Sequence, residues 1–168
     1  MFGLAAKPAR RCAPVSYTLD PMPTIRRVLA LWEIGLATDA DVRDCAAEAL
    51  RHSESPDDDL IELTLYGPHD CLNRPSADFA LRPEQIGFGE EFALRAQQLD
   101  LANDDAVDRF CIWAAHRAIT EDLSSSAVRV SYIIDHLLYD CQDPLSARQQ
   151  LRTQLPSLLA ALRIEGGV

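Results

Sequence analysis

The chain has 168 residues, a formal net charge of −10 and a sequence isoelectric point near 4.7. Its composition, 48% hydrophobic and 25% charged, is typical of a globular protein, and its length suffices for a core without disulfides or metal. Nucleic acids and anionic membranes recruit clustered lysine and arginine, so the acidic balance disfavours both as partners. Basic proteins remain candidate partners.

Charge and proline content divide the sequence near residue 23. The first 27 residues carry a net charge of +4, which leaves −14 for the remainder, and four prolines fall within the first 23 residues. Because proline disfavours a helix interior, we expect an extended N-terminal arm over residues 1–23. The rest, residues 24–168, is predicted to form a single helical domain.

The cysteine pattern and the hydropathy indicate in which cellular compartment the protein is expected. Five cysteines are widely spaced without a C-x-x-C pair, and no phosphate-binding or calcium-loop motif occurs, so we predict no disulfide framework, no metal site and no cofactor. No apolar segment is long enough to span a bilayer, and charges interrupt the region where a signal peptide would lie. We expect a cytoplasmic protein. An organellar transit peptide in the acid-free first 19 residues is a less favoured alternative.

Apolar spacing predicts three helices in the first part of the domain. The first begins at Thr24 and ends near Gly35, which suits a left-handed C-terminal cap. The second begins at Thr38 and continues past Leu50. Ser55, followed by proline, predicts the N-cap of a third helix that ends near Tyr66.

A long connection follows, and then the longest helical pattern in the chain. Glycines and prolines predict a loop over residues 67–89, before a helix over 90–99. Residues 104–141 predict a helical hairpin interrupted by three serines. Its expected buried side chains are Val107, Phe110, Cys111, Ala114, Ala118, Ile119, Val130, Ile133, Ile134, Leu137, Leu138 and Cys141.

The last helical region is predicted to begin at Asp143, with a break or kink at Pro156. Its inward-facing residues are expected to be Leu145, Leu151, Leu155, Leu158, Leu159 and Leu162. No strand-like alternation persists beyond a few residues. The expected fold is therefore all-α, with about six or seven helices packed as antiparallel hairpins.

Two groups of residues contain the ingredients of chemistry. His69 and Cys71 lie in the long loop, but neighbouring side chains point apart, so a thiol nucleophile there is disfavoured. His136 and Asp140 are four residues apart on one helical stripe with Tyr132, which predicts a histidine–carboxylate hydrogen bond on the helix surface. Neither group predicts catalysis, and no catalytic residue is assigned.

The segment over residues 33–62 contains ten acids and two arginines, a net charge of −8. Aspartates are common in the first turn of a helix, and a solvated acidic face is ordinary for soluble helices. The density of charge nevertheless favours an additional role, because an acidic patch accelerates association with a cationic partner.

A resemblance to a known family is carried by seven short segments, namely residues 28–36, 41–42, 46–47, 59–63, 113–114, 135–139 and 155–159. Together they resemble small acidic helical proteins of bacterial polymorphic-toxin systems, among them immunity proteins. The resemblance extends over most of residues 24–162 and excludes the arm. It implies a cytosolic protein that neutralises a toxin domain by tight binding, without catalysis.

The favoured function is a non-enzymatic module that binds a basic protein, such as a toxin nuclease domain. We expect the binding surface to combine acidic side chains with aromatic anchors from the long loop, namely Asp39, Asp41, Asp57, Asp58, Asp59, Phe79 and Phe88. Two alternatives remain: a helical scaffold or regulatory adaptor, and a hydrolase that depends on cysteine and histidine.

Overall fold

A computed structural model describes residues 24–55 and 57–165, and the predicted N-terminal arm lies outside these ranges. The fold is all-α, as predicted, and no strand occurs in the described residues. The elements are α1 (Ile25–Glu33), α2 (Asp39–Arg51), α3 (Asp58–Tyr66), α4 (Pro68–Leu72), α5 (Phe88–Gln97), α6 (Asp104–Ala118), α7 (Ser126–Asp135), the π-helical turn η1 (His136–Asp140) and α8 (Pro144–Glu165).

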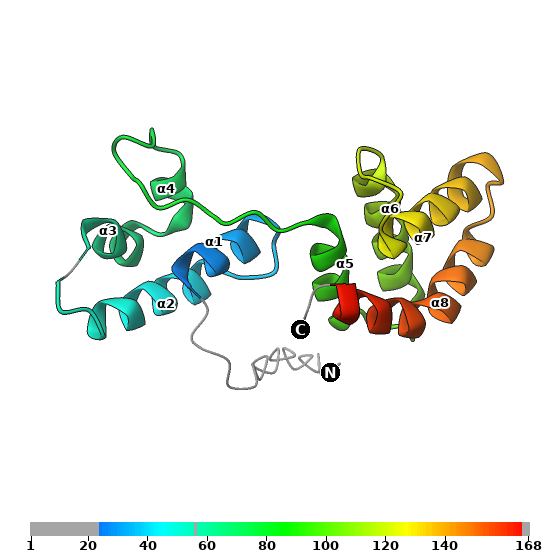
Figure 1. The fold of residues 1–168 in the computed structure, drawn as a ribbon, viewed down its shortest axis with the longest axis horizontal. Helices are drawn as coiled ribbons and strands as arrows, with labels where there is room; N and C mark the ends of the chain where they lie inside the picture. The colour runs from blue at the N-terminus through cyan, green and yellow to red at the C-terminus, as the bar shows by residue number, and fades with distance from the viewer. Residues whose placement is uncertain (1–23, 56, 166–168) are drawn as a thin grey trace, which may run out of the picture.

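The helices form two groups that lie side by side along the long axis of the molecule (Figure 1). α1–α4 make up one group and α5–α8, with η1, the other, and the segment over residues 73–87 joins them. The buried apolar side chains also form two clusters, one within each group. A single domain over residues 24–168 stays a prediction.

The core of the α1–α4 group is built from small and medium-sized side chains with one phenylalanine. Its fully buried members include Leu29, Val42, Leu63 and Cys71 from the four helices. Phe79 of the connecting segment completes this core and has no exposed surface. Phe79 thus fixes the segment after α4 against the α1–α4 core.

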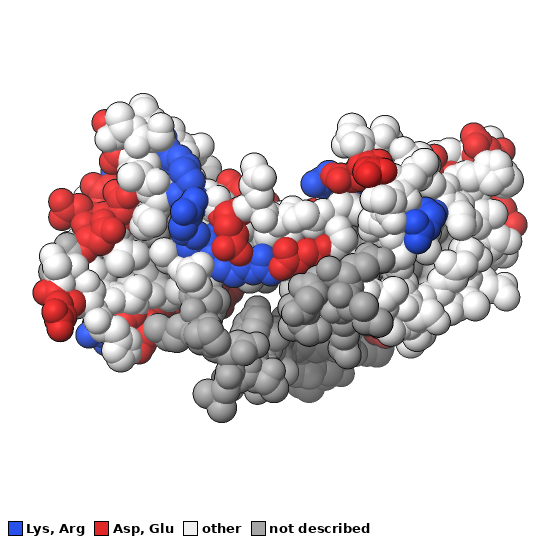
Figure 2. Space-filling model, viewed as in Figure 1, with Lys and Arg blue, Asp and Glu red and all other residues white. Residues whose placement is uncertain are grey.

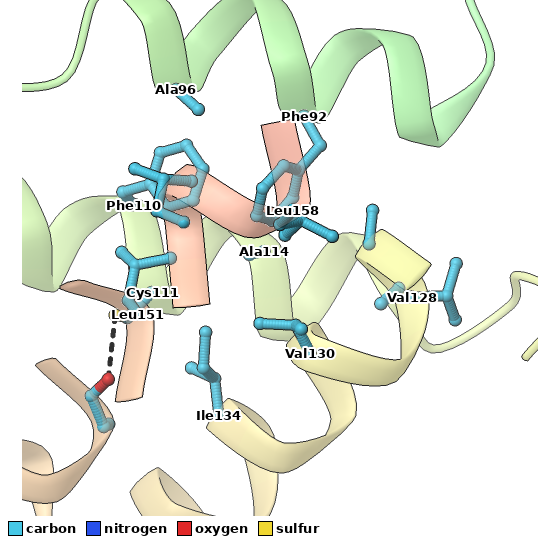
Figure 3. Close-up of a cluster of buried hydrophobic side chains, with 14 of the residues drawn as sticks. Phe92, Ala96, Phe110, Cys111, Ala114, Val128, Val130, Ile134, Leu151 and Leu158 are labelled. Carbon is cyan, nitrogen blue, oxygen red and sulfur yellow. Dashed lines mark hydrogen bonds between the residues drawn. The ribbon is translucent and has the colours of Figure 1, made fainter. Parts of the chain in front are cut away.

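The core of the α5–α8 group is built around aromatic rings (Figure 3). The ring centroids of Phe92 and Phe110 lie 5.0 Å apart in an edge-to-face arrangement, which suits the quadrupoles of the two rings. Trp113 packs against the edge of this core, half-buried, while Ala114 is fully buried. Burial of Phe110 and Ala114 confirms the predicted inner face of the hairpin.

Local sequence explains where several helices begin and end. Thr38 and Asp41 form a reciprocal capping box at the start of α2. Gly35 has φ +73° just beyond α1, which confirms the predicted left-handed position. Gly67, with φ +82°, ends α3, and a Cβ there would lie 2.8 Å from an Arg43 Nη atom.

The structure corrects the predicted start of α3. Asp57, and not Ser55, is the N-cap, and its side chain accepts a hydrogen bond from the backbone N–H of Asp59 at 3.0 Å. Aspartate and serine serve about equally well as N-caps, so residue type alone does not favour position 55 over position 57. The choice matters because Asp57 then stabilises the fold directly.

Other differences concern the loop and the last helix. The short helix α4 lies within the predicted loop over residues 67–89, with Pro68 at its first position, and it brings the number of α-helices in the described residues to eight. α8 continues through Pro156 without ending, because Leu155 and Leu158 on either side of it are buried in the same core. Four residues expected to be buried are exposed instead: Ile119, Ile133, Cys141 and Leu145.

Candidate partner-binding surface

The acidic segment forms α2, α3 and the turn between them. α2 and α3 pack against each other, and Arg43 of α2 donates to the carbonyl oxygens of Thr64 and Leu65 at the end of α3, at 3.1 and 2.9 Å. Acidic side chains gather over α3, at the outer end of this group of helices (Figure 2). Each predicted acid nevertheless has its own local environment.

The two predicted acids of α2 are engaged within the chain. Asp39 accepts a hydrogen bond from the indole N–H of Trp32 at 2.6 Å, which fastens α1 to the start of α2. Asp41 accepts from both the hydroxyl and the backbone N–H of Thr38, each at 2.7 Å. The Thr38 hydroxyl is the main cause that holds the pKa of the Asp41 carboxyl below its usual value. Both carboxylates are exposed but serve local structure.

Two of the three predicted acids of α3 also serve the fold. Asp57 is the N-cap described above. One carboxylate oxygen of Asp59 accepts hydrogen bonds from the backbone N–H groups of Ala80 and Leu81, at 2.8 and 2.9 Å. Asp59 thereby holds the connecting segment against α3 beside the buried Phe79. Its carboxylate is committed to this contact.

Asp58 and Glu54 differ from these acids. Both are exposed, and no arginine within the described ranges forms an ion pair with either of them. Asp58 begins α3, and Glu54 lies four residues earlier in the turn that follows α2. Their charges are therefore available to a partner in solution.

The expected aromatic anchors are corrected by the structure. Phe79 is fully buried in the α1–α4 core, and Phe88 is 3% exposed in the α5–α8 core, where its ring centroid lies 5.9 Å from that of Trp113. The sequence placed both residues in one long loop. In the structure one of them anchors that segment and the other begins α5, so neither presents an aromatic ring to a partner.

Three apolar residues of α3 that the sequence analysis missed are exposed instead. Ile61, Leu65 and Tyr66 are 38%, 61% and 51% exposed. Residues 58, 61 and 65 fall on one side of a helix at 3.6 residues per turn, so Asp58 shares a face with Ile61 and Leu65. The sequence does contain a signal for this exposure. Leu63 occupies the buried face of α3, so the apolar Ile61 and Leu65 on the other side of so short a helix are left to face solvent.

A cleft of about 970 Å³ lies at the junction of the two groups, lined by residues of α1, α5, α6 and the connecting segment. Buried Glu91 occupies it, with one carboxylate oxygen 2.9 Å from Arg95 Nε and the other 3.6 Å from Arg117 Nε. The polar groups in the cleft therefore largely satisfy one another, and this arrangement favours a structural role over ligand binding.

The two groups of residues that contain the ingredients of chemistry lie in different environments in the structure. Cys71 is buried in the α1–α4 core, and burial raises the pKa of its thiol, so it is not poised as a surface nucleophile beside His69. His136 Nδ1 lies 2.8 Å from an Asp140 carboxylate oxygen, which confirms the predicted surface hydrogen bond. Within the described ranges, no set of three or more His, Cys, Asp or Glu side chains is arranged to hold a metal ion.

Comparison with protein-family models, with curated proteins and with solved structures finds no significant match to this chain. In the described part of the chain, none of the helices combines the length and the apolar character that crossing a membrane requires.

Proposed function

We propose that this chain is a protein-binding module that recognises a cationic protein through the α3 surface, which comprises Glu54, Asp58, Ile61, Leu65 and Tyr66. The supporting observation is that this surface presents both kinds of group that a protein interface needs. Its exposed carboxylates, Asp58 of α3 and Glu54 of the preceding turn, accelerate encounter with a cationic partner. Its exposed apolar side chains hold the complex once water is excluded.

The resemblance to immunity proteins makes a cationic toxin nuclease domain the first partner to test. Nucleases that grip nucleic acid carry a basic surface, because phosphate contacts dominate such binding. An acidic protein seated on that surface blocks access to the substrate without any chemistry of its own. The net charge of −10 suits such a partner.

Affinity capture from a lysate of the source cell tests this proposal, at about 50 mM and about 500 mM salt. Three baits are compared: the unchanged protein, a Glu54→Gln/Asp58→Asn variant and an Asp105→Asn/Asp122→Asn control. The control also removes two charges from exposed positions, but in the α5–α8 group. We expect a basic protein on the first and third baits, with weaker retention by the α3 variant at low salt. Equal retention by all three baits would contradict the proposed surface.

A retained protein then needs a functional assay. If it degrades DNA or RNA, the unchanged chain is expected to inhibit it in proportion to the amount added, and the α3 variant is expected to inhibit less. Nuclease activity that persists in a saturated complex would argue against an immunity role and leave only protein binding.

An adaptor remains the second candidate, favoured by a separate apolar face on α6 and α7. Ile112, Ile119 and Tyr132 are exposed there, and the Tyr132 hydroxyl donates to the Ile119 carbonyl oxygen at 3.1 Å. Tyr139 of η1 stacks on His116 beside them, with ring centroids 5.6 Å apart. A partner bound through this face would be retained at high salt and would be insensitive to the α3 variant.

A further inference from the structure

The end of α7 widens into the π-helical turn η1, and Cys141 follows directly. The backbone N–H of Cys141 donates to the carbonyl oxygen of His136, five residues earlier, at 3.0 Å. In an α-helix, residues five apart point about 140° away from each other around the axis. The wider turn, with its i→i+5 hydrogen bond, brings the Cys141 side chain back beside His136.

His136 consequently lies between a thiol and a carboxylate. Its Nε2 atom is 3.5 Å from Cys141 Sγ, and its Nδ1 atom is 2.8 Å from Asp140 Oδ2. An ionised carboxylate only accepts hydrogen bonds, so Nδ1–H donates to Asp140 and Nε2 is left to accept from the thiol. The imidazole is thus placed to take the thiol proton, while the carboxylate orients the imidazole, which is the arrangement that activates a cysteine.

The other cysteines in the described part of the chain are placed differently. Cys71 and Cys111 are fully buried, and burial raises the pKa of the Cys111 thiol to about 11. Cys45 is half-buried, and burial raises its pKa as well. Cys141 is the exposed cysteine of this set. A reagent in solution therefore meets Cys141 first.

The geometry points to Cys141 as a thiol–disulfide exchange site for low-molecular-weight disulfides, with His136 as its base and Asp140 as the residue that positions the imidazole. The thiol proton passes to His136 Nε2, and the thiolate attacks one sulfur of the disulfide. A new S–S bond forms at Sγ as the original S–S bond breaks. The departing thiolate takes up the proton from His136, so one free thiol is released for each protein mixed disulfide.

The surroundings explain why a small disulfide suits this site. Cys141 does not line the junction cleft, and its neighbours His136 and Asp140 are exposed as well. Thiol–disulfide exchange needs access to the sulfur but no enclosed pocket for an acyl or peptide substrate. Cystamine is an appropriate probe, because its positive charge matches an acidic protein.

The test measures the rate at which cystamine modifies Cys141, by intact mass and peptide mapping. A Cys12→Ser background is used because Cys12 lies outside the described residues. We expect Cys141 to react first and His136→Gln to slow its reaction about tenfold or more. Added imidazole should restore part of the lost rate, which a purely structural role for His136 would not allow. His69→Gln, an exposed histidine beside the buried Cys71, is the matched control and should leave the rate unchanged.

Asp140 is tested through His136 in a double-mutant cycle. Asp140→Ala should slow the reaction when His136 is present and have no further effect in the His136→Gln background. Equal rates for the unchanged protein and His136→Gln would overturn the proposal, as would faster modification of Cys45, Cys71 or Cys111 than of Cys141. Circular dichroism of each variant verifies that the helices are retained.

Discussion

The guanidinium carbon of Arg95 lies 4.7 Å from the centre of a Trp113 ring, in a cation–π contact between α5 and α6. The same guanidinium donates to Glu91 at 2.9 Å and to the carbonyl oxygen of Ile34, just beyond the end of α1. Arg95 thus satisfies a buried carboxylate and joins the two groups of helices. A planar cation with several fixed donors is needed for three such contacts at once.

Arg95→Lys is therefore expected to be destabilising although it keeps the charge. A lysine reaches one of these partners but cannot reproduce the fork and the stacking, so we expect a loss of about 1–2 kcal/mol in the free energy of unfolding. Urea denaturation measures it. Arg109→Lys, at an exposed position on α6, is the control and should change stability by less than about 0.5 kcal/mol. Equal effects of the two substitutions would argue against a linking role for Arg95.

Asp59 and Asp58 are adjacent, yet we expect opposite consequences when each is replaced. Asp59→Ala leaves the N–H groups of Ala80 and Leu81 without their acceptor, and it should cost about 1–3 kcal/mol in urea denaturation. Asp58→Asn should be nearly neutral for stability, because its carboxylate is exposed. A destabilising Asp58→Asn with a neutral Asp59→Ala would reverse the assignment of these two acids.

Phe79→Ala probes whether the two clusters are independent units. Removing a fully buried ring from the α1–α4 core should cost about 3–5 kcal/mol. Because the two groups of helices have separate buried clusters, native-state hydrogen exchange should accelerate in α1–α4 more than in α5–α8. The matched Phe92→Ala, in the other cluster, should give the reverse pattern. Uniform acceleration in both variants would show one cooperative domain.

The capping box of α2 makes stability depend on pH at the acid end. Thr38 lowers the pKa of the Asp41 carboxyl in the folded state, so the stabilisation is present above the unfolded value of about 3.9 and is lost as pH falls through the lowered folded value. The destabilisation caused by Thr38→Ala should therefore be larger at pH 7 than at pH 3, as compared by urea midpoints. A difference that grows on acidification would contradict this sign.

Charge and apolar contact on the α3 surface should affect different rate constants once a partner is identified. Glu54→Gln/Asp58→Asn should slow association several-fold at low salt and flatten its salt dependence. Leu65→Ala removes a 61% exposed side chain without altering charge, so it should mainly accelerate dissociation. Surface plasmon resonance separates the two. An unchanged dissociation rate for Leu65→Ala would remove this residue from the interface.

Much of the helical architecture was predictable from local sequence. The Thr38 capping box, the left-handed Gly35 and the apolar period of the hairpin each involve residues within a few positions of one another. The hydrogen bond between His136 and Asp140 belongs to the same class, because four-residue spacing determines it. Such features need no knowledge of what the helix packs against.

Tertiary structure alone decided which residues expected to be exposed are buried, and which carboxylates accept hydrogen bonds within the chain. Phe79 and Phe88 lie nine residues apart in a stretch that contains Pro83 and Gly87, yet they enter two different cores. The carboxylate of Asp59 accepts hydrogen bonds from the backbone of residues 80 and 81, which pass beside it, whereas the carboxylate of Asp58 is exposed. Composition and helical period specify one face of each helix, but contacts between segments distant in the chain determine which side chains a partner can reach.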